Sequence, residues 1–404
     1  MNLVIFIAVA GLLTFLVHAL LRDRVPVTPI AVIVGFAASE LATGVGLDLG
    51  LRWETFADLI VLGALPVLIF EAAMLYDDRA AKARAGAILL IVGPALLLAI
   101  AVGAAVMFAL MDRPDIFNWQ AALYTGVLLA AIDPLAAIRL LRRFPECAGS
   151  GQLLASEGLL NDAIAVVLAS IVISTAGLAT PAAAGQAMLW LVAGGVGVGA
   201  IVAGVTVLAA RQQPAYERVV VLTLFAAYAS FAVAEALEVS GATSALVCGL
   251  LVRRQLRERI DGEALYRFWH GLSYATYYVM FLLMGATITL QMFTDRWLAM
   301  LIAIAAAIVS RAAVIYGVML PVSRLHNSFA TTSGERRMLF IGGTRGAITI
   351  ALALLIPIEQ PWWYTVQSMA YGVVIFSIFV QLPWLRYVAL PARETERSQR
   401  AATD

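Results

Sequence analysis

The sequence predicts an all-α membrane protein that crosses the bilayer about thirteen times. Of its 404 residues, 62% are hydrophobic and only 13% are charged, and the mean hydropathy is +0.91. Soluble globular domains do not have this composition. Apolar runs long enough to span the hydrocarbon core lie between charged or Pro/Gly-rich breaks. The expected spans are 2–21, 27–46, 55–76, 85–111, 119–142, 152–177, 184–210, 217–238, 240–254, 270–290, 297–322, 336–357 and 362–389.

The positions of Lys and Arg support these spans, because short cytoplasmic loops carry an excess of both. With the N-terminus outside, nearly all loop Lys and Arg fall on the inner side, and the outer loops hold only Arg52, Arg113 and Arg296. The first span has no basic region before it and is followed by two arginines, which indicates a retained span rather than a cleaved signal. We expect a multi-pass protein of the cell membrane with an outer N-terminus and a short cytoplasmic tail at 390–404.

The sequence argues against several functional classes. A net charge of +1 with scattered basic residues gives no continuous basic face for nucleic acid. Two isolated cysteines are too few for a disulfide framework or a zinc site. The histidines fall at or near predicted span ends without an HExxH pattern, so a hydrolase would lack its base or metal ligands. Asp133 and Asp162 could form an aspartyl dyad, but Ala163 stands where such motifs have glycine. We therefore predict neither an enzyme nor a cofactor.

Two expected spans contain residues that interrupt a helix. The fifth holds AAIDPLAAI, in which Pro134 removes a backbone donor and disfavours helix at Asp133. The twelfth holds IGGTRGAI, whose three glycines weaken the helix around Thr344 and Arg345. Irregular backbone at this depth is tolerated only where protein or a water-filled cavity satisfies it.

The two interruptions occupy corresponding places in two halves of the chain. We expect a single transmembrane domain with one repeat at 1–177, a connecting helix at 184–210 and a second repeat of opposite polarity at 217–389. Paired interrupted helices in inverted repeats are typical of the midplane site of a secondary transporter. Packing kinks, which Pro and Gly often produce in membrane helices, are the alternative.

Several ionisable residues fall inside expected spans, where each costs about 2.5–3.5 kcal/mol at mid-helix. So many are not expected by accident, although any single one could be a salt-bridged structural residue. The residues are Glu71, Asp133, Glu157, Asp162, Glu235, Arg311 and Arg345.

The segment SEGLLNDA places two carboxylates of the sixth span in different surroundings. Glu157 and Asn161 are four residues apart and share a helix face, whereas Asp162 lies about 140° around the helix from Glu157. Glu157 needs an intramembrane cation, and Arg345 in the interrupted twelfth span is the leading candidate. Such a pair would support the structure rather than transport an ion.

Asp162 has no obvious cationic partner, so its carboxylate is expected to take up a proton or to bind a metal cation. Gly158, four residues earlier, leaves room beside it for an ion or water. Carbonyl oxygens freed around Ile132 and Asp133 could complete the oxygen shell that hard cations prefer. Competition between a proton and an alkali cation for one carboxylate, with alternating access, constitutes an exchange mechanism. A protonated aspartic acid hydrogen-bonded between helices is the structural alternative.

Five motifs in order resemble those of the cation/proton antiporters, and within them the NhaP-type sodium/proton exchangers. FEAAMLYD resembles the family's FEAGL pattern, and AIDPLAAI resembles TDPVAV. SEGLLNDA is similar to GESLLNDA, and AEALEVSGATSALVCGLL to AEALGVSGILAVVVAGL. GGTRGAITIALAL is similar to GPRGAIHIAL. The resemblance covers nearly the whole chain, and the LLND and RGAI elements are its most specific parts.

The resemblance implies an NhaA-like fold of inverted repeats with crossing interrupted helices, in which a six-helix core moves against a dimerisation domain of a homodimer. It implies that Asp162 binds the transported cation or proton, with Asn161 beside it typical of exchangers that swap one cation for one proton. The other implied roles are Asp133 in the unwound crossover, Glu71 facing the site, Glu157 paired with Arg345, and Arg311 as a structural charge in the core.

Two positions depart from the family pattern, and both lose a hydroxyl near the expected ion. Ile132 replaces the family's threonine before the DP aspartate, and Gly158 replaces the serine four residues before the key aspartate. We expect electroneutral exchange of Na+ or Li+ for a proton at Asp162. The absence of these two hydroxyl groups favours K+/H+ exchange as the alternative. An ion-coupled organic anion symporter would need a larger cavity and a group to bind the substrate.

Overall fold

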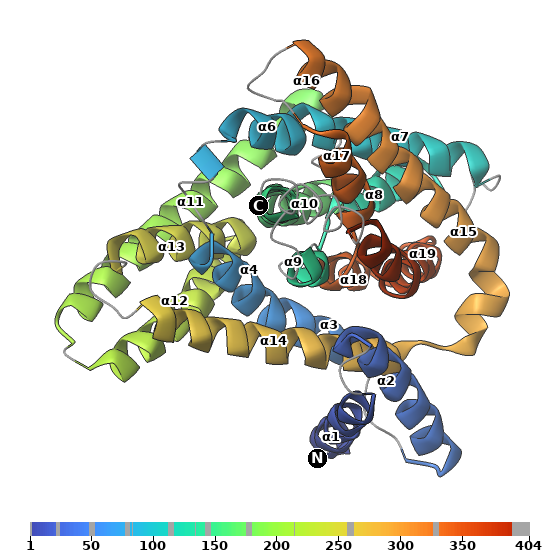
Figure 1. Cartoon of the computed structure of the whole chain (residues 1–404), viewed down its shortest axis with the longest axis horizontal. Helices are drawn as coiled ribbons and strands as arrows, with labels where there is room; N and C mark the ends of the chain where they lie inside the picture. Colours follow the sequence, from blue (N-terminus) through green and yellow to red (C-terminus); the bar gives the residue numbers. More distant parts are fainter. Residues whose placement is uncertain are drawn as a thin grey trace, which may run out of the picture. The chain divides into compact units, whose positions relative to one another are not determined.

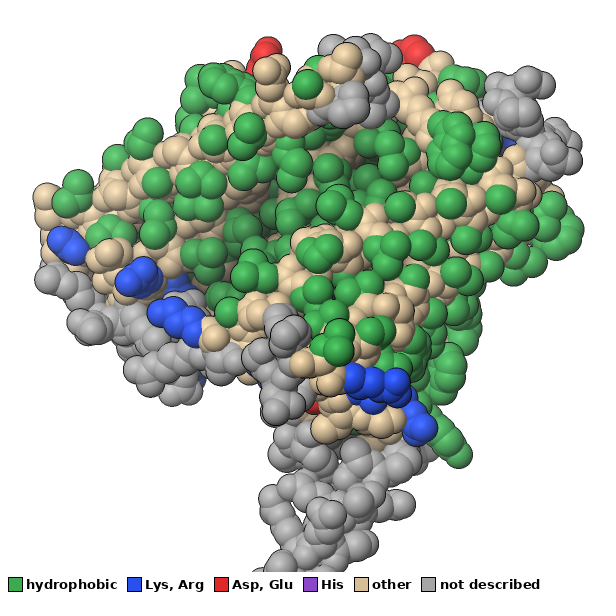
Figure 2. Space-filling view, turned by 90° about the horizontal axis from the view of Figure 1, so that it is seen from above, with side chains coloured by type: hydrophobic (Ala, Val, Ile, Leu, Met, Phe, Trp, Pro, Cys, Tyr) green, Lys and Arg blue, Asp and Glu red, His purple; other side chains and the backbone are tan. Residues whose placement is uncertain are grey.

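The computed structural model is helical wherever the chain forms regular structure within the residues that it describes (Figure 1). Hydrophobic side chains cover most of the face seen in Figure 2, and many large ones are exposed, including Val4, Leu12 and Leu189. The described residues are 2–21, 25–47, 53–76, 81–82, 84–111, 117–133, 135–141, 147–174, 180–213, 215–256, 262–325 and 331–389.

Ten helical segments among the described residues are long and apolar enough to cross a membrane. They are Asn2–Leu20, Val27–Gly44, Thr55–Met74, Ala85–Leu110, Gly149–Ile173, Ala182–Arg211, Tyr216–Ala236, Leu290–Leu325, Ser333–Leu354 and Trp363–Ala389. Three further expected spans fall on α8 (Trp119–Ala130) with α9 (Leu135–Leu141), on α13 (Gly241–Leu256) and on α14 (Gly262–Thr287). The predicted all-α polytopic fold class is confirmed.

The chain forms two compact units. Unit 1 comprises Met1–Tyr76 and Val166–Gln291, and unit 2 comprises Asp77–Ala165 and Met292–Asp404. Each unit therefore takes residues from both expected repeats, and the boundaries of these repeats stay a prediction. Unit 2 holds expected spans four, five and eleven to thirteen and the first part of span six, whose remainder belongs to unit 1. The expected tail at 390–404 lies outside the described residues.

Unit 1 is built from helices that pack in closely spaced pairs. In Figure 1, α11, α12 and α13 lie side by side, and α14 packs on α2 and α4. Phe70 of α4 stacks on the buried Trp269 of α14, with ring centroids 4.7 Å apart. The helices are α1 (Asn2–Leu20), α2 (Val27–Gly44), α3 (Trp53–Asp58), the π-helix η1 (Leu59–Ala64), α4 (Leu65–Met74), α11 (Pro181–Arg211), α12 (Tyr216–Ala236), α13 and α14.

Glycine makes the contact between α2 and α14 possible. A Cβ atom at Gly35 would lie 2.0 Å from the Leu282 carbonyl oxygen, and one at Gly285 would lie 2.2 Å from the Val32 carbonyl oxygen. The two helices thus present glycine to each other's backbone. Small residues permit this approach between membrane helices, where van der Waals packing replaces the hydrophobic effect.

Glu235, one of the ionisable residues expected inside a span, lies in the last turn of α12. Its Oε1 atom accepts a hydrogen bond from the Gly241 backbone N–H, the first residue of α13, at 3.0 Å. The intervening Glu238 has a φ of 55°, which reverses the chain between the helices. Glu235 therefore satisfies a backbone donor at a helix start, and a carboxylate is favourable there.

Unit 2 contains the two expected interruptions. The fifth span divides into α8 and α9, and the twelfth into α17 (Ser333–Gly342) and α18 (Ala347–Leu354). Pro134 itself lies outside the described residues. The remaining elements are α6 (Ala85–Leu90), η2 (Ile91–Ala95), α7 (Leu96–Leu110), α10 (Ala148–Ile173), α15 (Leu290–Ala312), η4 (Ala313–Met319), α16 (Leu320–Leu325), α19 (Trp363–Phe376) and η6 (Ser377–Gln381).

We predict that Gly285→Ala destabilises the protein by about 1–3 kcal/mol, because the added methyl group forces α14 away from α2. Gly44→Ala is the matched control, since a Cβ at Gly44 of α2 would meet nothing within 4 Å. Thermal unfolding of the purified protein in detergent measures both. An unchanged unfolding temperature for Gly285→Ala would show that the two helices do not pack this closely.

Candidate functional site

Hydrogen bonds between two extended segments join the interrupted helices of unit 2. α8 ends at Ala130 and is followed by extended backbone through Asp133. The Asp133 N–H donates to the Thr344 carbonyl oxygen at 2.9 Å, and the Thr344 hydroxyl donates to the Asp133 carbonyl oxygen at 2.7 Å. Backbone groups released from both helices thereby satisfy one another, as the membrane interior requires. Asp133 therefore lies between the two parts of the interrupted helix, and its role in a crossover of two helices stays a prediction.

The Asp133 carboxylate lies at the start of α18, where its Oδ2 atom accepts a hydrogen bond from the Ala347 N–H at 3.1 Å. It takes the place of a side-chain cap, because Gly346 at the N-cap position has none. A Cβ at Gly346 would lie 2.2 Å from the same Oδ2 atom, so only glycine fits there. A carboxylate at a helix N-terminus is also favoured by the helix dipole.

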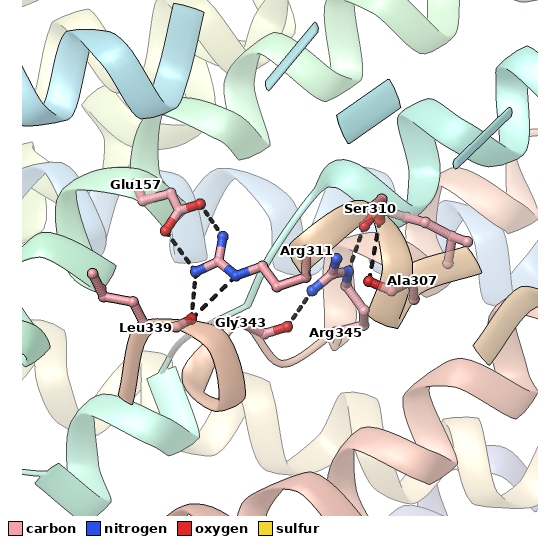
Figure 3. Close-up of polar contacts among 8 residues, drawn as sticks. Glu157, Ala307, Ser310, Arg311, Leu339, Gly343 and Arg345 are labelled. Carbon is pink, nitrogen blue, oxygen red and sulfur yellow. Dashed lines mark hydrogen bonds and ion pairs between the residues drawn. The ribbon is translucent and has the colours of Figure 1, made fainter. Parts of the chain in front are cut away.

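Glu157 of α10 pairs with Arg311 of α15 and not with Arg345, so the expected pairing is wrong (Figure 3). Both partners are buried, at 2% and 5% exposure. Arg311 Nη1 and Nη2 each donate to one oxygen of Glu157, the second at 3.0 Å. Nε and Nη2 of Arg311 also donate to the Leu339 carbonyl oxygen of α17, at 3.1 and 2.6 Å. The two-pronged contact and the carbonyl satisfy a buried pair whose desolvation would otherwise be costly.

Arg345 is held by carbonyl oxygens of the two interrupted segments. Its Nε donates to the Leu129 carbonyl oxygen in the last turn of α8, and its Nη1 donates to the Gly343 carbonyl oxygen. Its backbone N–H donates to Ser377 Oγ at 3.0 Å, and this hydroxyl donates to Gln381 Oε1 at 2.5 Å. The Arg345 side chain therefore donates to carbonyl groups that the interrupted helices leave without a partner.

Asp162 is the carboxylate of the site that forms no ion pair within the part of the chain that the structure describes. Its Oδ1 atom is buried and has no hydrogen-bond partner among the residues that the structure describes. Asp133 and Arg345 are close enough to act on it electrostatically. The neighbouring Asn161 also has a buried, unpartnered Oδ1 atom under the same restriction, and Gly158 is buried one turn earlier. An oxygen in this state requires a proton, a water molecule or a cation.

A small cavity opens in unit 2, with a volume of about 10 Å³ that a water-sized sphere can enter. It is below the roughly 300–1,000 Å³ typical of sites for organic ligands. Asp162, Asp133 and Gly158 are not among its lining residues, whereas Ile132 and Asn161 are. The lining residues are Ile91, Leu96, Ala99, Ala130, Ile132, Glu157, Asn161, Arg311, Val314 and Arg345.

Glu71 belongs to unit 1, so the structure groups it with residues other than Asp162. Its side chain is 2% exposed, and its Oε1 atom lies 3.8 Å from His270 Nδ1 of the same unit. The role that the resemblance gives Glu71, facing the ion site, stays a prediction.

Two residues of a hydrogen-bond chain that reaches the Arg345 backbone were not predicted from the sequence. Ser377 binds the Arg345 backbone, and Gln381 accepts from Ser377. The available signal was a serine and a glutamine four residues apart in the apolar thirteenth span. Such polar pairs on one helix face can serve the backbone of a neighbouring helix.

Three carboxylates and two guanidinium groups make up the charged part of the site in unit 2. Fully ionised, Asp133, Glu157, Asp162, Arg311 and Arg345 carry a net charge of −1. One proton or one monovalent cation would neutralise the set. Because uncompensated charge is costly in a membrane interior, the arrangement suits the binding of a single positive charge.

A family model described as the transmembrane part of sodium/hydrogen exchangers matches residues 4–389. The chain belongs to the sodium/hydrogen exchanger family. The match spans nearly all of both units, and the predicted resemblance to NhaP-type exchangers is confirmed. As a member of this family, the chain is a multi-pass membrane protein.

Individual relatives extend this result. The Na+/H+ antiporter NhaP of Pseudomonas aeruginosa is 27% identical over 402 residues, covering 93% of each chain. The Na+/H+ antiporter NhaS2 of Synechocystis sp. is 26% identical over 393 residues, covering 95% of this chain and 69% of the relative. The structure of the sodium proton antiporter MjNhaP1 from Methanocaldococcus jannaschii matches with a TM-score of 0.78 at 16% identity, covering 96% and 99% of the two chains. This chain therefore shares its fold.

We predict that Arg311→Ala lowers the free energy of unfolding by about 3–5 kcal/mol, because it leaves the Glu157 carboxylate buried without its cation. Arg84→Ala is the control, since the Arg84–Glu335 pair is partly exposed and such pairs contribute about 0–1 kcal/mol. Denaturation of the purified protein in detergent measures both changes. Equal losses for the two variants would contradict the structural role of the Glu157–Arg311 pair.

Proposed function

We propose that the protein is a secondary antiporter that exchanges Na+ or Li+ for a proton across the membrane. The observation that carries this function is the buried, unpartnered Asp162 oxygen in a chain of the sodium/hydrogen exchanger family. A carboxylate in that environment binds either a proton or a cation. The small cavity and the crossover carbonyl groups beside it favour an ion over an organic substrate.

Competition between the two ions at Asp162 supplies the coupling. When Asp162 holds a proton, its oxygen cannot serve a cation, and arrival of the cation displaces the proton. Ile132 and Asp133 lie in the extended segment, where carbonyl oxygens are available as ligands, and Gly158 adds no side chain beside Asp162. The Glu157–Arg311 pair and Arg345 are proposed to support the site without binding the transported ion.

The charges of the site favour a one-for-one, electroneutral exchange. The five ionised groups of the site leave a deficit of one positive charge, which either ion restores. Asn161 next to Asp162 agrees with the family pattern for this stoichiometry. In an alternating-access cycle, only the site with a bound proton or cation would move between the two sides of the membrane. The empty site carries a net charge of −1, and moving that charge through the low dielectric of the membrane interior is costly.

The cellular setting is also part of the proposal. The bias of basic residues supports an outer N-terminus and an inner C-terminus in the cell membrane. The family resemblance supports a homodimer. The relatives, which are Na+/H+ antiporters, support a transporter rather than an enzyme and a function without a cofactor.

K+/H+ exchange is the second candidate function, and Ile132 is the observation that favours it. Ile132 lines the cavity in place of the hydroxyl-bearing family residue, and Gly158 contributes no hydroxyl either. Fewer fixed oxygen ligands weaken selection for the smaller, more strongly hydrated ion. An organic anion symporter has less support, because the cavity is small for such a substrate.

We predict that a pulse of Na+ or Li+ collapses an imposed pH gradient in proteoliposomes and that Asp162→Asn abolishes the response. Asparagine keeps the size of the side chain but can neither release a proton nor attract a cation. A pH-sensitive dye inside the vesicles measures the gradient, and parallel pulses of K+ and Rb+ determine the ion preference. Normal exchange by Asp162→Asn would remove Asp162 from the mechanism.

We predict that the exchange rate is independent of membrane potential, because a one-for-one cycle moves no net charge. In vesicles clamped at different potentials with valinomycin and K+, the initial rates of Na+-driven proton movement should coincide. Vesicles without protein provide the background. A rate that changes systematically with the potential would exclude the proposed stoichiometry.

A further inference from the structure

Three buried polar side chains of unit 2 each have an atom that finds no hydrogen-bond partner among the residues that the structure describes. They are Thr349 of α18, Gln367 of α19 and Trp362 at the N-cap of α19, each at most 1% exposed. Thr349 Oγ1, Gln367 Nε2 and Trp362 Nε1 find no hydrogen-bond partner within the described ranges. Polar groups this deep in a protein are normally paired with protein or with ordered water.

These residues follow one another from Asp133 toward the connection between α18 and α19. Thr349 lies two residues after Ala347, whose N–H binds the Asp133 carboxylate. From Ala347, α18 continues to Leu354, which is about 10 Å along the helix axis at 1.5 Å per residue. Trp362 stands at the far end of the connection, beside the exposed Pro361.

Thr349 and Gln367 lie at similar depth on neighbouring helices. Thr349 is five residues before the end of α18, and Gln367 is five residues after Trp362 at the start of α19. α8, α18 and α19 pack on one another, and they lie side by side in Figure 1. The Tyr124 ring of α8 contacts the Trp362 ring at 5.6 Å between centroids.

Two polar side chains of the neighbouring α8 have hydrogen-bond partners. The Thr125 hydroxyl donates to the Ala121 carbonyl oxygen at 2.7 Å, and the Tyr124 hydroxyl donates to the Leu352 carbonyl oxygen at 2.6 Å. In unit 1, the equally buried Trp269 donates from its indole N–H to Thr223 Oγ1 at 3.1 Å. Other buried side-chain atoms without a partner among the described residues include Asn161 Oδ1, Asp162 Oδ1 and Arg296 Nε, whereas Thr349, Gln367 and Trp362 are the ones on α18 and α19.

We propose that Thr349, Gln367 and Trp362 bind a short chain of water molecules that carries protons between Asp133 and the membrane face at the α18–α19 connection. In the proposed orientation this is the outer face. The hydroxyl can both donate and accept, and the amide and indole N–H groups donate, so together they can orient a continuous hydrogen-bonded chain. The proton-carrying role rests on the proposed exchange, whereas water binding does not.

Radiolytic footprinting of the full-length protein tests water binding directly. X-rays generate hydroxyl radicals from bound water, and these oxidise the adjacent aromatic rings. Trp362 should be oxidised several-fold faster than Trp269, although the structure buries both completely. Oxidation of Trp362 no faster than that of Trp269, measured by mass spectrometry, would overturn the proposal.

Variants connect the water to these side chains. Thr349→Val combined with Gln367→Leu should slow Trp362 oxidation several-fold, because two of the polar groups are gone. Thr125→Val is the matched control and should leave it unchanged, since the Thr125 hydroxyl already has its partner in α8. Thr349→Ser retains a hydroxyl and should behave as the wild type, which separates loss of water from loss of packing.

Proton movement is measured on the same variants in proteoliposomes. The double variant should exchange several-fold more slowly than the wild type and Thr125→Val, while Thr349→Ser should not. The proton-carrying role would be overturned if Trp362 is oxidised fast in the wild type but the double variant exchanges protons at the wild-type rate. If the wild type moves no protons at all, the proposed exchange fails, and the proton-carrying role fails with it. Trp362 oxidation still decides the water site in that case.

Discussion

The reciprocal hydrogen bonding between Asp133 and Thr344 is the constraint from which the site in unit 2 follows. Breaking two helices inside a membrane releases backbone donors and acceptors that lipid cannot satisfy. Here Asp133 and Thr344 each donate a hydrogen bond to the other's carbonyl oxygen. The Asp133 carboxylate accepts from the Ala347 N–H, and the Arg345 guanidinium donates to the Leu129 carbonyl oxygen. Asp133 and Arg345 thus form hydrogen bonds to the backbone without any bound ion. Among the carboxylates of the site, Asp162 is the one with a buried oxygen that has no partner among the described residues.

The fold class could be predicted from sequence because hydrocarbon imposes a length and a composition on every span. The interruptions could be predicted as well, since Pro and Gly act locally on the backbone. Asp162 stood out because helix periodicity separates it from Glu157. None of these inferences needed knowledge of which helices are neighbours.

The partner of Glu157 could not be predicted in the same way. Arg311 and Arg345 are both single intramembrane arginines, and periodicity within one helix does not tell which of two other helices comes closer. The Leu339 carbonyl oxygen, a backbone group without any sequence signal, helps to hold Arg311. Ser377 was missed for a related reason, because it binds the Arg345 backbone through a serine that resembles many others in membrane helices.

The Arg311 guanidinium contacts two helices besides its own, since it binds a side chain of α10 and a main-chain carbonyl of α17. A single rigid plane therefore fixes the spacing of α10, α15 and α17. Sliding any one of them along another would break several charge-assisted bonds at once in a medium that offers no replacement. These three helices are consequently constrained to move as one block, so the movement that the proposed exchange requires would have to come from other parts of the chain.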